Sequence, residues 1–174
     1  KGDVDMRLFD IEVKVMKLSP CATLPTYSRE GDAGIDLYTA NDIVIMPYET
    51  IAIPTDIAMA IPQGHEGTIR PRSGNSLNGV KGCKRIPNDY IWDVSECDDC
   101  QPYLRVQLGT IDSNYRGNIG IITYNQEGYM VFIPKGTKLA QLVISPIDQC
   151  ILTEVNSLDD TNRGINGFGS SGHR

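Results

Sequence analysis

Short runs of apolar and β-branched residues recur along the chain, with Gly, Pro, Asn or Asp between them. Each run has the length of a strand and is rich in Ile, Val, Thr and Tyr, which strands favour. Most of the 10 prolines and 17 glycines stand between the runs, where they mark turns. The pattern predicts an all-β sandwich, jelly roll or barrel, and the runs are IEVKVMKL, DIVIMP, TIAIPTDIAMAIP, GTIRP, NIGIITYN, YMVFIP and KLAQLVISPI.

Three segments do not fit this pattern. In SGNSLNGVKG, Ser76 could cap a short helical turn, which the glycines keep brief. Segment 81–101 holds three of the five cysteines and the only tryptophan, and it predicts an insertion between strands. The Gly-rich residues 162–174 fit either a frayed terminus or an arm that closes over something. The whole chain, 1–174, has the length of one domain.

Charge and cysteine content limit the classes of partner. The chain carries 16 basic and 22 acidic residues, a net charge of −6, whereas duplex-binding proteins usually have a basic excess. No apolar run is long enough to span a bilayer, and the first residues contain no signal-peptide core. An odd number of cysteines, five, favours reduced thiols. We therefore expect no nucleic-acid partner, no membrane insertion and a cytoplasmic location.

Familiar catalytic patterns are missing from the sequence. The two histidines, His65 and His173, do not suit a Ser-His-Asp or Cys-His hydrolase. Neither a GxxxxGK[ST] loop nor a GxGxxG turn occurs. The chemistry is therefore expected to use carboxylates, backbone amides, hydroxyls and arginines.

Five stretches have compositions unusual for plain strands. Arg72, Ser73 and Gly74 offer a guanidinium, a hydroxyl and an accessible amide, which suit an anion. Asp112 follows an apolar residue and could hold a water, and Gln141 needs polar partners inside an apolar strand. Each stretch alone also fits an ordinary turn, loop or backbone-bonded side chain. The five are DAGIDLYTA, RPRSGNS, LGTIDSNYRGNIG, GTKLAQLVI and NRGINGFGSSGHR.

In this order and spacing, the five stretches resemble the motifs of the homotrimeric dUTPase (deoxyuridine triphosphate nucleotidohydrolase) family. The resemblance runs from about Ile11 to Gly172, apart from 81–101. It implies a jelly-roll-like, β-clip subunit of a homotrimer, with active sites at subunit interfaces and a mobile C-terminal arm, 162–174, that closes over a neighbour's site. The implied reaction is hydrolysis of dUTP to dUMP and pyrophosphate by water attack at the α-phosphorus, with Mg²⁺ on the triphosphate. The reaction keeps uracil out of DNA and supplies dUMP for dTMP synthesis.

The resemblance also implies roles for individual residues. Asp112 matches the general base, and Asp36 matches a carboxylate that contacts the metal indirectly, through water. Tyr115 matches the residue that packs on the deoxyribose and leaves no room for a 2′-hydroxyl. Arg72 matches a phosphate ligand and Phe168 a ring that stacks on uracil. The other implied substrate-binding residues are Ser73, Gly74 and Gln141 at the phosphates, Gly109, Thr110 and Ile111 at the uracil edge, Arg163 at the γ-phosphate, and Gly169, Ser170 and Ser171 around the phosphates.

Departures from the family pattern leave alternatives open. Val106 stands where many members have Asn, and the insertion could be a surface excursion, a protein-binding surface or, with three thiols, part of a zinc site. A dCTP deaminase, alone or combined with dUTPase activity, is the nearest rival, but Ile122 occupies the position of its catalytic Glu. A dUTPase with an added regulatory role through the insertion is the other alternative.

Overall fold

The computed structural model describes residues 11–80, 82–85 and 101–165. These residues form short strands and one short helix, so the expected all-β fold is confirmed. The elements are β1 (Lys14–Lys17), β2 (Ile35–Tyr38), β3 (Ile43–Ile45), β4 (Thr50–Pro54), β5 (Ile57–Ala60), β6 (His65–Pro71), α1 (Ser73–Asn78), β7 (Cys83–Arg85), β8 (Leu104–Val106), β9 (Gly109–Ile111), β10 (Gly120–Asn125), β11 (Met130–Ile133) and β12 (Lys138–Pro146).

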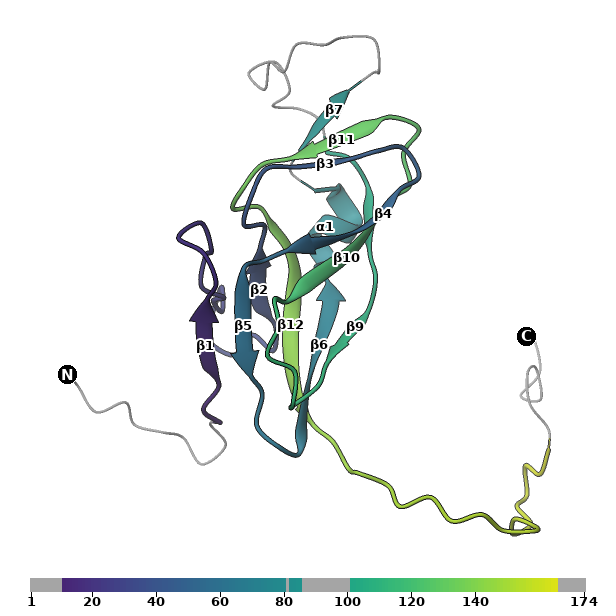
Figure 1. Cartoon of the computed structure of the whole chain (residues 1–174). Helices are drawn as coiled ribbons and strands as arrows, with labels where there is room; N and C mark the ends of the chain where they lie inside the picture. Colours follow the sequence, from purple (N-terminus) through teal and green to yellow (C-terminus); the bar gives the residue numbers. More distant parts are fainter. Residues whose placement is uncertain (1–10, 81, 86–100, 166–174) are drawn as a thin grey trace.

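The described strands pair antiparallel in four small sheets (Figure 1). The largest has the order β2-β12-β6-β9, and its long strand β12 pairs with β2 on one side and β6 on the other. Two three-stranded sheets have the orders β4-β10-β8 and β3-β11-β7, and β1 pairs with β5. Each sheet joins strands that are far apart in the sequence, so distant motifs can meet on one surface.

The core follows from alternation along these strands. In β10, Ile121, Thr123 and Asn125 are fully buried, while their neighbours face outward. Leu139 and Leu142 of β12 are also fully buried in the same cluster. Burial of a large aliphatic side chain contributes about 1.5–3 kcal/mol relative to its exposure. Packing in the core therefore fixes the position of β12, which carries part of the site.

Helix α1 begins earlier than the sequence indicates. Its N-cap residue is Arg72, and Ser76 lies inside the helix, where its hydroxyl donates to the Arg72 carbonyl oxygen at 3.1 Å. The prediction that Ser76 caps the helix is therefore wrong. Gly79 ends the helix at φ 82°, and a Cβ there would clash with the carbonyl oxygen of Gln101. The phosphate-binding turn expected at Ser73 and Gly74 is the first turn of this helix.

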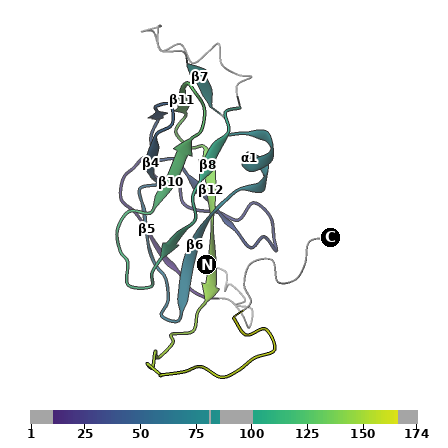
Figure 2. The same cartoon turned by 90° about the vertical axis from the view of Figure 1, so that its right-hand side faces the viewer.

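Beyond β12 the chain leaves the body of the molecule. Residues 147–165 run as an extended segment below β12 in both views (Figures 1 and 2). Its apolar side chains are exposed, with 93% exposure at Ile151, 92% at Leu152 and 84% at Leu158. These side chains are therefore accessible for contact with another molecule. The segment that departs from the body is therefore longer than the arm expected from composition.

Segment 81–101 is described only at its two ends. Strand β7 pairs with β11, so the start of the expected insertion belongs to a sheet. Residues 86–100, which include Cys97 and Cys100, lie outside the described residues, as does any test of a zinc site there. Within the described ranges, no helix has the length and hydropathy required to cross a membrane.

Candidate active site

Three of the five stretches meet in one pocket of about 540 Å³. Strand β2 and the loop before it supply the first stretch, the junction of β6 and α1 the second, and β12 the fourth. Three arginines and two aspartates line the pocket. The lining residues are Ser28, Arg29, Asp32, Ala33, Gly34, Asp36, Arg70, Arg72, Ser73, Gly74, Gln141 and Val143. We call this cavity the phosphate pocket.

Strand register explains why these side chains converge. Asp36 of β2 lies directly opposite Gln141 of β12, which in turn lies opposite Arg70 of β6. Residues opposite each other in an antiparallel pair project to the same face, with Cβ atoms about 4.5–5.5 Å apart. The three strands therefore present a polar row across the sheet, beside the first turn of α1.

Asp36 is the most constrained residue of the pocket. It is 4% exposed. Its Oδ1 accepts from Arg72 Nε at 2.9 Å, and its Oδ2 accepts from Ser28 Oγ at 2.6 Å and pairs with Lys138 Nζ at 2.7 Å. Burial alone would raise the pKa of Asp36, but the hydrogen bonds from Lys138 and Ser28 and the charges of Arg72 and Lys138 lower it below its ordinary value. The carboxylate is thus held ionised.

Lys138 ties the two sides of the pocket together. The hydrogen bond and charge of Asp36 raise the pKa of Lys138, although partial burial opposes this. The carbonyl oxygen of Lys138 accepts from Asn75 Nδ2 at 2.9 Å, which fastens α1 to β12. Arg72 stands between the two and is oriented by Asp36. The network fixes the guanidinium at the pocket wall.

The side chain of Gln141 packs closely against Gly34. Its Nε2 donates to the Pro71 carbonyl oxygen at 3.0 Å. A Cβ at Gly34 would collide with the Gln141 amide, reaching its Cδ at 2.9 Å. Only glycine therefore leaves room for this amide, and Gln141 is satisfied by backbone while it faces the pocket.

The third stretch lies on another part of the sheet. Gly109, Thr110 and Ile111 form β9, which pairs with β6, and Asp112 follows as an exposed residue. Tyr115 is 42% exposed, and its hydroxyl donates to the Asn118 carbonyl oxygen at 2.9 Å. Both Asp112 and Tyr115 are therefore accessible to a ligand.

Within one chain, Asp112 and the phosphate pocket are far apart. Ile111 lies opposite Gly67, near the start of β6, whereas Arg70 and α1 lie at its other end (Figure 1). Three strand steps of about 4.8 Å separate β9 from β2, and Asp112 is offset from the Asp36 row by about four residues of 3.3 Å each. The two aspartates are therefore about 19 Å apart, too far to act on one phosphate.

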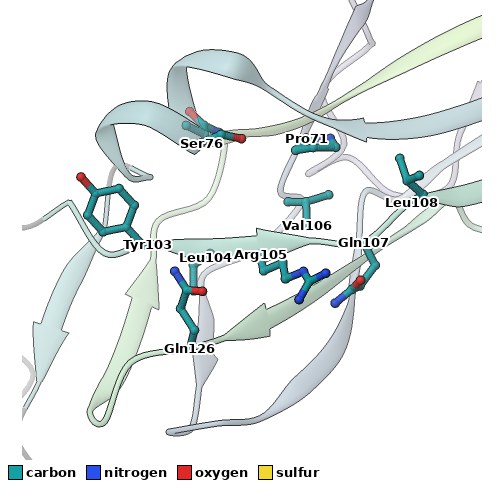
Figure 3. Close-up of a pocket in the computed structure, with 10 residues that line it drawn as sticks. Pro71, Ser76, Tyr103, Leu104, Arg105, Val106, Gln107, Leu108 and Gln126 are labelled. Atoms are coloured by element: carbon teal, nitrogen blue, oxygen red, sulfur yellow. The ribbon is translucent and has the colours of Figure 1, made fainter. Parts of the chain in front are cut away.

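A second pocket of about 620 Å³ lies between α1 and β8 (Figure 3). Pro71 and Ser76 stand on one side, and the β8 residues with Gln107 and Leu108 stand on the other (Figure 3). Val106 lines it and is 8% exposed, so it packs in the core. This pocket borders both the phosphate-binding turn and the strand expected to read uracil.

The remaining expected residues belong to the C-terminal segment. Arg163 is exposed near the end of the described chain, and the backbone N–H of Gly164 donates to the Thr161 carbonyl oxygen at 3.0 Å. Phe168, Gly169, Ser170 and Ser171 lie outside the described residues. Their expected roles therefore remain predictions.

Sequence reasoning missed several residues that hold the site. Lys138 is a charged residue at the start of an apolar strand, and this is the only sequence feature that could have identified it as a site residue. No sequence feature identifies Ser28 as a site residue. Gly34 and Gly117 are needed for close side-chain contacts, and only the three-dimensional structure shows them.

Comparison with known proteins identifies the family of the chain. The dUTPase family model matches residues 21–101 and 99–172, which together cover most of the chain. The chain belongs to the dUTPase family. The family match, like the strand content, confirms the resemblance seen in the five stretches.

Relatives of this dUTPase-family chain include proteins of bacteria, phages and a poxvirus. The deoxyuridine 5′-triphosphate nucleotidohydrolase of Clostridium kluyveri is 39% identical over 165 residues, with 93% of this chain and 99% of that protein covered. Staphylococcus bacteriophage 80alpha dUTPase, solved with dUPNHPP, has a TM-score of 0.75 at 29% identity, covering 93% of this chain and 99% of that one. Its structure is reported with the statement that phage dUTPases control transfer of virulence genes by a proto-oncogenic G protein-like mechanism.

A mutant dUTPase from phage phi11 of S. aureus gives a TM-score of 0.68 at 28% identity, covering 84% of this chain and 98% of that one. That structure is reported to reveal the coordination of a structural Mg(II) ion. Because these likenesses extend over nearly the whole length of each relative, the family assignment applies to the chain as a whole and not to one segment of it.

Proposed function

We propose that this chain hydrolyses dUTP to dUMP and pyrophosphate, the activity for which its relatives are named. The observation that carries the proposal is the convergence of Asp36, Arg72, Ser73, Gly74 and Gln141 in one cationic pocket of a dUTPase-family chain. Such an arrangement suits a triphosphate, because a guanidinium, helix-start amides and a hydroxyl all donate to phosphate oxygens.

Asp112 acts as the general base. It accepts a proton from the water that attacks the α-phosphorus, and the α–β bridging oxygen leaves with pyrophosphate. A positioned base of this type typically contributes about 10²–10⁴-fold to the rate. Its exposure in the single chain supports the role, since the carboxylate is free to meet a substrate.

Substrate selectivity belongs to β9 and Tyr115. The β9 backbone from Gly109 to Ile111 reads the uracil edge, and the Tyr115 ring packs on the deoxyribose. The hydroxyl of Tyr115 is anchored on the Asn118 carbonyl, which fixes the ring. A fixed ring excludes a 2′-hydroxyl by contact. We also assign Arg163, Phe168 and the amides of Gly169–Ser171 to the phosphates and base of the bound nucleotide.

Magnesium fits the pocket as a partner of the triphosphate. Among the described residues, no three His, Cys, Asp or Glu side chains gather to hold a metal ion. Asp36 already receives three donors, and a carboxylate can accept about four. The remaining position fits an indirect contact through water, since Mg²⁺ commonly keeps several waters and binds substrate phosphates. When bound, the ion would neutralise charge on the phosphates.

Assembly of the site requires more than one copy of the chain. The separation of about 19 Å between Asp112 and Asp36 follows from strand spacing. The exposed apolar side chains of 147–165 supply surface for contact between copies. We propose a homotrimer in which Asp112 of one copy faces the phosphate pocket of another and the C-terminal arm closes the site.

Two further assignments concern the cellular location and a protein partner. Cys21 and Cys150 are free thiols, which supports a reducing compartment such as the cytoplasm. Segment 81–101 contributes β7 to the β3-β11-β7 sheet, and we propose it as the surface for a protein partner if the chain has a regulatory role.

Deamination of dCTP is the less supported alternative. Ile122, at the position of the expected catalytic Glu, is an aliphatic side chain on the outer face of β10 and is 41% exposed. It supplies no carboxylate to activate a water at the cytosine ring.

Pyrophosphate release tests the proposed function directly. With Mg²⁺ present, we expect release from dUTP and far less from dCTP, dTTP or UTP. Asp112→Asn should lower kcat by about 10²–10⁴-fold, because the general base is removed. Inactivity of the wild type towards dUTP, or undiminished turnover by the variant, would overturn the mechanism, and a deoxyuridine nucleotide formed from dCTP would establish the deaminase.

A further inference from the structure

Arg70 is a cation of the phosphate pocket whose side chain is uncommitted. It occupies the penultimate position of β6 and is exposed. In the part of the chain that the structure describes, its guanidinium has no hydrogen-bond or ion-pair partner. Arg72, by contrast, donates its Nε to Asp36 at 2.9 Å. One arginine therefore builds the pocket wall, and the other keeps its donors for a ligand.

The direction of Arg70 follows from strand alternation. Successive residues of an extended chain face opposite sides. Pro71 lines the pocket beside β8 (Figure 3), whereas Arg70 and Arg72 both line the phosphate pocket. Arg70 thus projects to the same side as Asp36 and Gln141, its neighbours in the polar row.

Electrostatics favours an anion beside Arg70. The chain carries a net charge of −6, yet three arginines line this pocket against two aspartates. Lys138 and Arg72 balance Asp36, and the Asp32 carboxylate accepts from the Arg29 backbone at 2.8 Å. The guanidinium of Arg70 is therefore not neutralised locally. Arginine presents a planar set of donors that matches phosphate oxygens.

We propose that Arg70 is a further ligand of the phosphate chain of the nucleotide, beside Gln141. The assignment rests on the proposed hydrolysis of dUTP. Arg70 holds the phosphates equally in the bound substrate and in the transition state, so it contributes to affinity and not to the chemical step. Its removal should raise KM and leave kcat nearly unchanged.

Steady-state kinetics on the full-length protein tests this assignment. For Arg70→Ala we expect the KM for dUTP to rise about tenfold, as for the loss of a charge-assisted hydrogen bond, with kcat within twofold of wild type. The inhibition constant of pyrophosphate should rise by a similar factor. Arg70→Lys should recover part of the loss, because it keeps the charge but not the planar set of donors.

Lys17→Ala is the matched control, since it removes one exposed positive charge from β1, outside the pocket. It should leave KM and pyrophosphate inhibition unaltered, and circular dichroism should show all variants folded. An unchanged KM in Arg70→Ala, with wild type active on dUTP, overturns the role of Arg70 alone. A wild type that does not hydrolyse dUTP overturns the proposed function itself.

Discussion

At the scale of single residues, the centre of the phosphate pocket is an ion network and not an isolated carboxylate. Asp36 was expected from the sequence, but its partners Ser28 and Lys138 were not. They come from a loop and from the first residue of β12, 102 positions after Asp36. Sequence patterns report local periodicity, so they identify a chemical group more readily than the distant residues that orient it.

The ion network predicts a pH dependence of stability. The pKa of Asp36 is lower in the folded chain than in the unfolded chain, so the folded state binds fewer protons there. Its contribution is complete above the unfolded pKa of about 3.9 and is lost as the pH falls through the folded pKa. Lys138 has the opposite sign, because its pKa is raised, so its contribution is lost only as the pH rises above about 10.4.

Asp36→Asn should lower the free energy of unfolding by about 1–3 kcal/mol at pH 7, because it removes a buried carboxylate that accepts from Arg72, Ser28 and Lys138. Urea denaturation from pH 2.5 to 8 should show the difference from wild type shrinking below about pH 4, where Asp36 itself becomes neutral. A difference that stays constant over this range would show that charge on Asp36 does not stabilise the fold.

A glycine controls the position of Tyr115. A Cβ at Gly117 would collide with the Tyr115 hydroxyl and approach its Cζ at 2.6 Å. Gly117→Ala should therefore displace the ring and make room at the sugar. We expect the ratio of kcat/KM for dUTP to that for UTP to fall about tenfold, a change of about 1.4 kcal/mol in discrimination.

Gly120→Ala is the matched control for Gly117→Ala. A Cβ at Gly120 meets its nearest atom, the Ala52 Cβ, at an ordinary distance of 3.6 Å. This variant should keep the discrimination of the wild type. If both variants discriminate as the wild type does, the position of the Tyr115 ring does not determine sugar selectivity.

At the scale of elements, strands that lie in apolar or alternating runs were predictable, and three short strands outside such runs were not. Alternation with β-branched residues identifies β10 and β12, which the structure contains. Strands β7, β8 and β9 have three residues each, too few to show a period. They exist because β11, β10 and β6 supply their hydrogen-bond partners. Whether such a short segment forms a strand depends on pairing with a strand elsewhere in the chain. The local sequence pattern carries no information about that pairing.

The C-terminal segment has two parts with different expected roles. Residues 147–162 expose Ile151, Leu152 and Leu158, which we propose contact another copy, and residues from Arg163 onward are assigned to the nucleotide. Deletion from Arg163 should leave an assembled protein with activity about a hundredfold lower, as for the loss of phosphate donors. Deletion from Ile147 should also abolish assembly. Analytical ultracentrifugation and pyrophosphate release measure the two effects separately.

Equal activity in the full chain and the chain ending at residue 162 would contradict the role of the arm. A chain that ends at Pro146 and still assembles would show that the exposed apolar side chains of 147–165 are not an interface.

At the scale of the whole molecule, the catalytic parts of one chain do not meet. The sequence gives each part a chemical role, but the order of motifs along a chain says nothing about which copies share a site. Strand register separates two of these parts within one chain, because it places Asp112 and the phosphate pocket at opposite ends of β6. The proposed site is therefore shared between copies, as in the closed symmetric assemblies that most oligomers form.

Complementation between two inactive variants is the most direct measurement of this claim. Asp112→Asn lacks the base, and Arg72→Ala lacks the phosphate ligand, so each alone should be nearly inactive. After the two are unfolded together and refolded as a 1:1 mixture, random assembly should restore about a quarter of the sites, because half of the copies offer an intact base and half an intact pocket. Recovery of pyrophosphate release near this level is the predicted result. A mixture as inactive as its components would show that Asp112 and Arg72 of the same chain form the site.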